Sequence, residues 1–544
     1  MGSSPIIPSE LWIYGIFKVM KIKQTINSIS GWRFQVFVIW IILTSLNVTK
    51  AYHIDDTFHL LAAENIKNTP CSPMSGLINW NNVLAPGYKY NQPPLFFYLI
   101  AATESIAGNR EIVMHLMLSI FTFFSLYYFA KLSVLLRIKS ISPILFIFGF
   151  CPALIVNQNL MTDVPVLSIT IGVIYFIMKA RNENKLKYYI ISSILLSIGL
   201  LIKYSTLPLL IVIALATFAT DYKKILVLLI PVSTLLLWSC WNFYEFGEIH
   251  ILSRPKYNFE IKKIIAFLGT IGSISTFSLF FFYNYLKRTR IIYVVYFTII
   301  LFSAFLTYLY LYRDITTDLI ISMCFILNGL TVTSAILKKS VSLFFQEGHI
   351  FIKTPYFIIL MCIIGFSSFT ILFAPFNATR HILLFWPFLL LFVEKYFFQK
   401  NVFLIKSTVY LTILLGLLLG ISDWLYADFY RKSVDKIDAK NNIVWSIGNW
   451  GWQWYSTKAG MIIYSKGDEK EIKTGDLVVY PANIPKQNFP ENMQMDTLQL
   501  IINKPSPWTF LSVKNGSMYN SFVTKPAWTI SSKPLDTIIV CRIK

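Results

Sequence analysis

Long apolar runs alternate with short polar segments over most of the chain. A helix needs about 20 apolar residues to cross the hydrocarbon layer of a bilayer. We predict about 13 transmembrane helices from the runs that approach this length. They are 34–49, 110–130, 141–157, 164–179, 188–203, 205–220, 225–243, 264–286, 291–311, 318–337, 355–374, 381–398 and 402–422.

One further apolar run, 95–107, directly follows the Pro93-Pro94 pair. It is too short to span comfortably, so we predict a helix that lies along the membrane interface. The runs 188–203 and 205–220 are short for spans, and we expect them to be tilted or broken.

Composition supports this interpretation. Apolar residues make up 55% of the chain and charged residues only 14%, whereas soluble domains are about a quarter charged. The formal charge of +21 would suit a nucleic-acid partner. However, the lysines and arginines gather in short clusters between the apolar runs, where they orient helices in a membrane. We therefore expect no nucleic-acid partner.

Basic residues fix the predicted orientation, because loops rich in Lys and Arg stay inside. With the N-terminus inside, the predicted inside loops carry Lys18, Lys21, Lys23, Arg33, Lys131, Arg137, Lys139, Lys179, Arg181, Lys185, Lys187, Lys223, Lys224, Lys287, Arg288, Arg290, Lys338, Lys339 and Lys400. The loop 50–109 and the tail then face outward. We expect a multi-pass membrane protein, in the plasma membrane of a prokaryote rather than in the endoplasmic reticulum.

The tail differs from the rest of the chain. From Asp423 onward charge, Gly and Pro increase, and short alternating runs at 476–480 and 537–541 predict strands. The predicted fold class is thus a polytopic α-helical membrane protein with a small, mostly β, extracytoplasmic C-terminal domain. We place the membrane domain at 1–423 and the outward domain at 424–544.

Two adjacent carboxylates, Asp55 and Asp56, follow the first span. Neighbouring carboxylates at a membrane edge repel each other and lose hydration. A site that takes a proton from a hydroxyl, or holds a cation, would use them. The alternative is a solvated helix cap, since Asp is common at helix N-termini.

Other ionisable residues map to the same outward side. Asp163 begins a span, where the helix dipole favours a carboxylate, so a simple cap is also possible. Lys203 and Arg380 are candidate phosphate ligands, with snorkelling to the interface as the alternative. The histidines His53, His59, His250 and His381 face outward too.

Metal binding is left open by the sequence. The outward histidines and acids are of types that bind a divalent metal, but no ligand spacing supports such a site. The six cysteines are scattered and predict neither a zinc site nor a disulfide framework.

Five short motifs occur in order across residues 34–398. They are Asp55-Asp56, Gln92-Pro93-Pro94-Leu95, Thr162-Asp163-Val164-Pro165, Gly199-Leu200-Leu201-Ile202-Lys203, and Arg380-His381 followed by Trp386-Pro387. In this set the chain resembles the GT-C class of membrane glycosyltransferases. The resemblance is to the branch related to protein O-mannosyltransferases and the lipid A aminoarabinose transferase.

The resemblance implies a sugar donor carried on a polyprenyl phosphate, drawn from the membrane lipids. The acceptor would be a protein, glycolipid or polysaccharide on the outer face. By the same resemblance Asp55 or Asp56 would be the general base, with Asp163 supporting the site. Lys203 and Arg380 would neutralise the leaving phosphate. Relatives often place a basic residue just before the paired prolines, where this chain has Gln92, and Lys89 is the candidate substitute.

Two other functions compete with an enzyme. A secondary transporter or lipid flippase usually places ionisable residues near mid-membrane and often has repeated halves. Here the acids cluster at the outward edge, and no second half is evident. No glycine-rich phosphate loop supports a nucleotide-driven pump. A non-catalytic assembly protein that binds through its tail is the third possibility.

Overall fold

The computed structural model describes residues 31–80, 84–90, 92–218, 221–254, 259–278, 317–397, 401–503, 509–511, 518–519, 525–530 and 534–544. Within this part of the chain, six helical segments are long and apolar enough to cross a membrane. They are Glu111–Leu135 (α5), Asp163–Glu183 (α8), Tyr222–Phe246 (η4 and α11), Asp318–Glu347 (in α16), Pro355–Phe373 (α18) and Val402–Val434 (α21). The chain is a multi-pass membrane protein.

Shorter helices fill most of the other predicted spans. They are α2 (Gly31–Asn47), α6 (Ile141–Gly149), α7 (Pro152–Val156), α9 (Leu186–Ile202), α10 (Pro208–Phe218), α12 (Ile261–Ile274) and α20 (Trp386–Phe397). The short runs at 188–203 and 205–220 are separate helices joined at a 3-10 turn, Tyr204–Thr206. The run at 291–311 and the end of 264–286 lie outside the described residues, so the count of about 13 spans stays a prediction.

The predicted span 141–157 is two helices rather than one. Helix α6 ends at Gly149, and α7 begins at Pro152. Proline has no backbone N–H to donate and favours the first turn of a helix, so the break falls before it. The predicted span 381–398 is also divided, into α19 (Thr379–Ile382) and α20.

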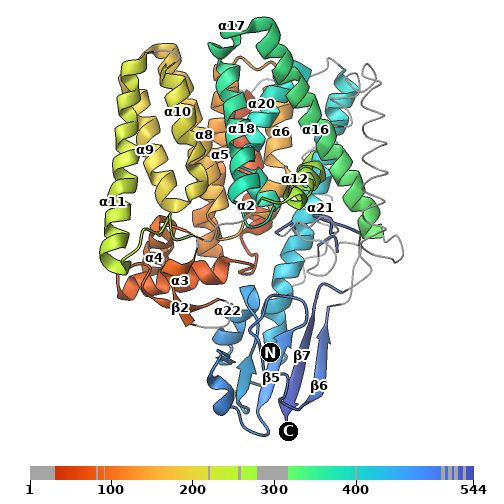
Figure 1. Ribbon diagram of the computed structural model, residues 1–544. Coiled ribbons are helices and arrows are strands. Elements are labelled where there is room, and N and C mark those ends of the chain that lie inside the picture. Colours follow the sequence, from red (N-terminus) through yellow and green to blue (C-terminus); the bar gives the residue numbers. More distant parts are fainter. Residues whose placement is uncertain are drawn as a thin grey trace.

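Two helices lie across one end of the bundle. Figure 1 shows α3 (Asp56–Asn68) and α4 (Leu95–Ala107) there, next to the sheet and opposite the end that carries α17 (His349–Ile352). Helix α4 has the bounds predicted for the interfacial helix. The small antiparallel pair β1 (Leu77–Asn79) and β2 (Leu84–Pro86) joins them. The distribution of Lys and Arg predicts that this end faces outward, and we refer to it as the outward end.

The tail forms a five-stranded sheet at the outward end (Figure 1). The strands run in the order β4-β3-β5-β7-β6, with β3 parallel to β4 and β5 and the other pairs antiparallel. Their bounds are Val444–Ser446, Ile462–Ile463, Leu477–Pro481, Met495–Ile502 and Thr537–Ile543 for β3 to β7. Both predicted strands are present, as the adjacent β5 and β7, so the β-rich tail is confirmed.

Helix α21 connects the bundle to this sheet without a break. It continues to Val434, eleven residues past the predicted domain boundary at 423. Helix α22 (Trp450–Lys458) then packs against both α21 and α3. The division into domains at 423/424 stays a prediction, but the tail is in contact with the membrane part.

Candidate active site

Asp55 forms an ion pair with Arg380. The Asp55 carboxylate lies directly before α3, and Arg380 is in the short helix α19. Arg380 Nη1 donates to Asp55 Oδ2 at 2.7 Å, and the two side chains are 10% and 24% exposed. The pair is therefore still reached by solvent. The residues are more than 300 positions apart, and two helix termini at the outward end bring them together.

A second ion pair joins the other two predicted residues. Lys203 Nζ donates to Asp163 Oδ1 at 2.7 Å. Asp163 is the first residue of α8, so its charge suits the positive end of the helix dipole, and Lys203 follows the last turn of α9. Arg380 interacts electrostatically with both Asp55 and Asp163, so the four charges alternate in sign. We call these four residues the charge cluster.

Polar atoms with no hydrogen-bond partner lie within the charge cluster. Among the described residues, Asp163 Oδ2 and Arg380 Nε are buried and make no hydrogen bond, and the same holds for His381 Nδ1 next to Arg380. Buried polar groups are nearly always satisfied in folded proteins. Unused donors and acceptors beside paired charges are what a site for a polar ligand needs.

Asp56 has a different environment from its neighbour. Its side chain is fully buried, Oδ2 accepts the backbone N–H of His53 at 2.8 Å, and Oδ1 has no partner among the described residues. Burial raises the pKa of Asp56 to about 8. The carboxyl is consequently protonated for the most part at neutral pH. The sequence could not distinguish the two acids, and the structure does.

Sequence reasoning missed a third ion pair. Lys50 and Asp423 pair with both side chains fully buried, and Lys50 Nζ also donates to the Val156 carbonyl at 3.1 Å. The Tyr519 hydroxyl lies 3.0 Å from each Asp423 carboxylate oxygen. The available signal was one ionisable residue at the end of the first predicted span and one at the end of the last.

The histidines are held in protein contacts. His53 packs edge-on against Tyr426, with ring centroids 4.5 Å apart. His59 Nδ1 lies 2.6 Å from the Leu160 carbonyl oxygen, and burial lowers the pKa of His59, which keeps it neutral. His250 contacts the Tyr204 hydroxyl. Among the residues described, no group of three or more His, Cys, Asp or Glu side chains could hold a metal ion.

Lys89 is exposed at the end of the 3-10 turn Gly87–Lys89. No ion pair involves it in the part of the chain that the structure describes, and its role in phosphate binding stays a prediction. Gln92 is half-buried, and its side-chain oxygen has no hydrogen-bond partner among the described residues.

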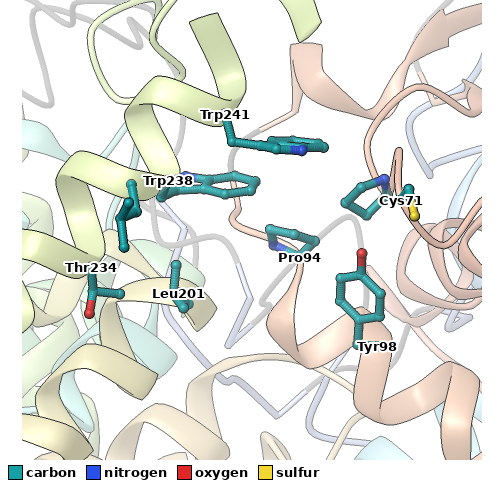
Figure 2. Close-up of a pocket in the computed structure, with 9 residues that line it drawn as sticks. Cys71, Pro94, Tyr98, Leu201, Thr234, Trp238 and Trp241 are labelled. Carbon is teal, nitrogen blue, oxygen red and sulfur yellow. The ribbon is translucent and has the colours of Figure 1, made fainter. Parts of the chain in front are cut away.

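An apolar cavity of about 410 Å³ lies between α4, the end of α9 and α11. Figure 2 shows Trp238 and Trp241 on one side and Pro94 and Tyr98 facing them. Leu201 also lines the cavity, two residues before Lys203. Aromatic side chains of this kind gather at the depth of lipid headgroups. The cavity thus lies near the C-terminal end of α9, which Lys203 follows.

Residues 91–241 match the family model described as dolichyl-phosphate-mannose-protein mannosyltransferase. The chain resembles the GT-C glycosyltransferases. The match covers less than half of the chain and contains Asp163, Lys203 and most of the cavity lining, but neither Asp55 nor Arg380. The predicted resemblance to membrane-bound glycosyltransferases is confirmed over this part of the chain.

Solved structures of membrane transferases are similar at low identity. Apo ArnT from Cupriavidus metallidurans is 11% identical, with 83% of this chain and 93% of that chain covered and a TM-score of 0.41. ArnT bound to undecaprenyl phosphate has the same identity and coverage and a TM-score of 0.38. The archaeal oligosaccharyltransferase AglB from Archaeoglobus fulgidus, in complex with an inhibitory peptide and a dolichol-phosphate, is 10% identical, with 83% and 70% covered and a TM-score of 0.47. No curated protein sequence matches the chain.

Proposed function

We propose that this protein moves a sugar from a polyprenyl-phosphate donor to an acceptor hydroxyl on the extracytoplasmic face. The observation that carries the proposal is the charge cluster, in which two carboxylates and two cations alternate at the outward end. A reaction that releases a phosphate and a proton needs both kinds of group. The family match over residues 91–241 supports the same chemistry.

In the proposed reaction the acceptor oxygen attacks the anomeric carbon of the sugar. A bond forms between these two atoms, and the bond from the anomeric carbon to the phosphate oxygen breaks. The electron pair stays on the phosphate, and the acceptor proton passes to a carboxylate. Cations placed where negative charge develops lower the barrier. Arg380 and Lys203 are the candidates for this role.

Asp55 is the proposed base, rather than Asp56. Asp55 is partly exposed and ionically paired, so it can reach an acceptor. Asp56 is buried, which keeps it from an acceptor, and burial raises its pKa to about 8, so the ionised form that a base needs is the minor form at neutral pH. Arginine has five N–H donors, and Arg380 can therefore contact a phosphate while it holds Asp55.

The apolar cavity is the proposed place for the first isoprenoid units of the carrier. The cavity is lined mainly by hydrocarbon and aromatic groups, which match a polyprenyl chain. The Trp238 indole N–H donates to the Tyr204 hydroxyl at 2.9 Å, and Tyr204 follows Lys203. The lipid would then contact Trp238, and its phosphate would bind Lys203, which is the sequence neighbour of Tyr204.

The test compares Asp55→Asn with Asp56→Asn in membranes supplied with a polyprenyl-phosphate sugar. Removing a general base typically costs about 100-fold to 10,000-fold in rate. We expect that loss for Asp55→Asn, whereas Asp56→Asn, which imitates the protonated acid, keeps transfer close to that of the parent. Full transfer by Asp55→Asn would exclude Asp55 as the base.

A further inference from the structure

The tail contacts the segments that carry Asp55 and Arg380 at two places. On one side the Thr57 hydroxyl donates to the Trp450 carbonyl at 2.6 Å, and the Tyr52 N–H donates to the Tyr455 hydroxyl at 2.8 Å. Both contacts connect α22 to the segment that carries Asp55. Gly451 packs so closely there that an added Cβ would lie 2.3 Å from the Tyr52 carbonyl oxygen. The tail therefore fixes the position of the acidic segment.

On the other side Met518 holds the start of the helix that carries Arg380. The Met518 carbonyl accepts the Thr379 N–H at 3.1 Å and the Thr379 hydroxyl at 2.8 Å. Thr379 is the first residue of α19, and an unsatisfied N–H at a helix start is ordinarily capped by a neighbouring side chain or by water. Here a tail carbonyl more than 130 residues away takes that role.

Tyr519 ties the same tail segment to the membrane part. Its side chain is 1% exposed, and its hydroxyl accepts from Asn159 Nδ2 at 2.7 Å. The hydroxyl proton can be donated to Asp423 or to the Val156 carbonyl, each 3.0 Å away. Asn159 belongs to the turn that leads into Asp163. Tyr519 thus contacts the elements that carry Asp163 and Asp423, while its neighbour Met518 holds α19.

We propose that Tyr519 is a positioning residue of the active site, contributed by the tail. It fixes Met518, and through Met518 it fixes Arg380 against Asp55. The inference rests on the proposed function for what Arg380 binds, but the placement itself rests only on the contacts above. The C-terminal segment is then part of the catalytic unit rather than a separate binding module.

The test variant is Tyr519→Phe, which removes only the hydroxyl. Its matched control is Tyr464→Phe, because Tyr464 is equally buried in the tail and its hydroxyl contacts Glu469, inside the sheet region. With a polyprenyl-phosphate sugar, we expect Tyr519→Phe to raise the donor KM at least tenfold and to leave the acceptor KM unchanged. Tyr464→Phe keeps both values, and in an Arg380→Ala background Tyr519→Phe adds little further change in the donor KM.

Amide hydrogen exchange of peptides covering residues 377–382 gives a second measurement that needs no activity. Faster exchange in Tyr519→Phe than in Tyr464→Phe is expected, because α19 loses its anchor. Equal donor KM and equal exchange in the two variants would overturn the inference. If the parent protein transfers no sugar, the proposed function fails, and the exchange comparison alone then decides whether Tyr519 positions α19.

Discussion

Two kinds of ion pair meet at the outward end of the bundle, and they are built differently. The pairs of the charge cluster are partly exposed, and Asp163 and Arg380 keep buried polar atoms with no partner among the described residues. The Lys50–Asp423 pair is completely buried, and both partners make further hydrogen bonds. The first arrangement leaves polar atoms without partners, whereas in the second the two charges bind each other and further hydrogen-bonding groups. This difference is expected if the charge cluster binds the proposed substrates and the Lys50–Asp423 pair holds the fold together.

The largest expected effect is the loss of stability when the buried Lys50–Asp423 pair is broken. Removing one partner of a buried ion pair costs about 3–5 kcal/mol, because the other charge stays buried without compensation. We expect Lys50→Met to lower the melting midpoint and the yield of folded protein in detergent strongly. Lys203→Met should disturb folding less, because Arg380 still interacts electrostatically with Asp163 after the lysine is removed. Equal melting midpoints in these two variants would remove the distinction between the pairs.

The next effect is on the charge cluster. Truncating one partner of a hydrogen-bonded charge pair at a binding site costs about 2–5 kcal/mol. For Arg380→Ala we expect kcat/KM for the donor to fall about 30-fold or more, since 1.4 kcal/mol is tenfold. The melting midpoint should change little. Arg380→Lys should be intermediate, because an ammonium lacks the planar fork that binds a phosphate through two contacts. An unchanged donor kcat/KM would show that Arg380 has only a structural role.

Much of this fold could be predicted from hydrophobic patterning. The interfacial helix 95–107 has its predicted bounds, and the strands β5 and β7 lie where alternation placed them. The break between α6 and α7 was missed because a run of apolar residues does not show where a helix turns. Pro152 was the available local signal.

The sequence indicated the charged residues of the candidate site but not how they pair. Asp55, Asp163, Lys203 and Arg380 could be chosen as candidates from the sequence, because ionisable residues at the ends of apolar runs are conspicuous. Their pairing could not be predicted, since Asp55 and Arg380 come from distant segments. Tyr519 carried no signal at all, because one tyrosine in a polar tail has no pattern, and its burial depends on how the tail folds back.

A third experiment measures whether Asp56 is protonated or ionised in the folded protein. Its folded pKa of about 8 lies above the ordinary value of 3.8, so between these values the folded state holds one proton more than the unfolded state. Stability then falls as pH rises, by up to about 1.4 kcal/mol per pH unit. We expect Asp56→Asn to flatten the fall in melting midpoint between pH 5 and pH 7.5. An identical pH dependence in Asp56→Asn and the parent would show that Asp56 is already ionised in the folded protein.

The smallest expected effect is on the donor KM, through the apolar cavity that we propose for the carrier lipid. If the apolar cavity receives the carrier lipid, Trp238→Ala removes part of its wall together with the hydrogen bond to Tyr204. Losing one aromatic contact of this kind costs about 1–2 kcal/mol, or roughly 5-fold to 30-fold in affinity. We expect the donor KM to rise by that factor with a long polyprenyl chain and to change little with a donor of one or two isoprene units. Trp424→Ala is the control, because Trp424 lies on α21, where its indole N–H donates to the Thr49 hydroxyl. If the donor KM rises by the same factor for long and short chains, Trp238 supports Tyr204 and Lys203 rather than binding the lipid. The donor site would then be limited to the charge cluster.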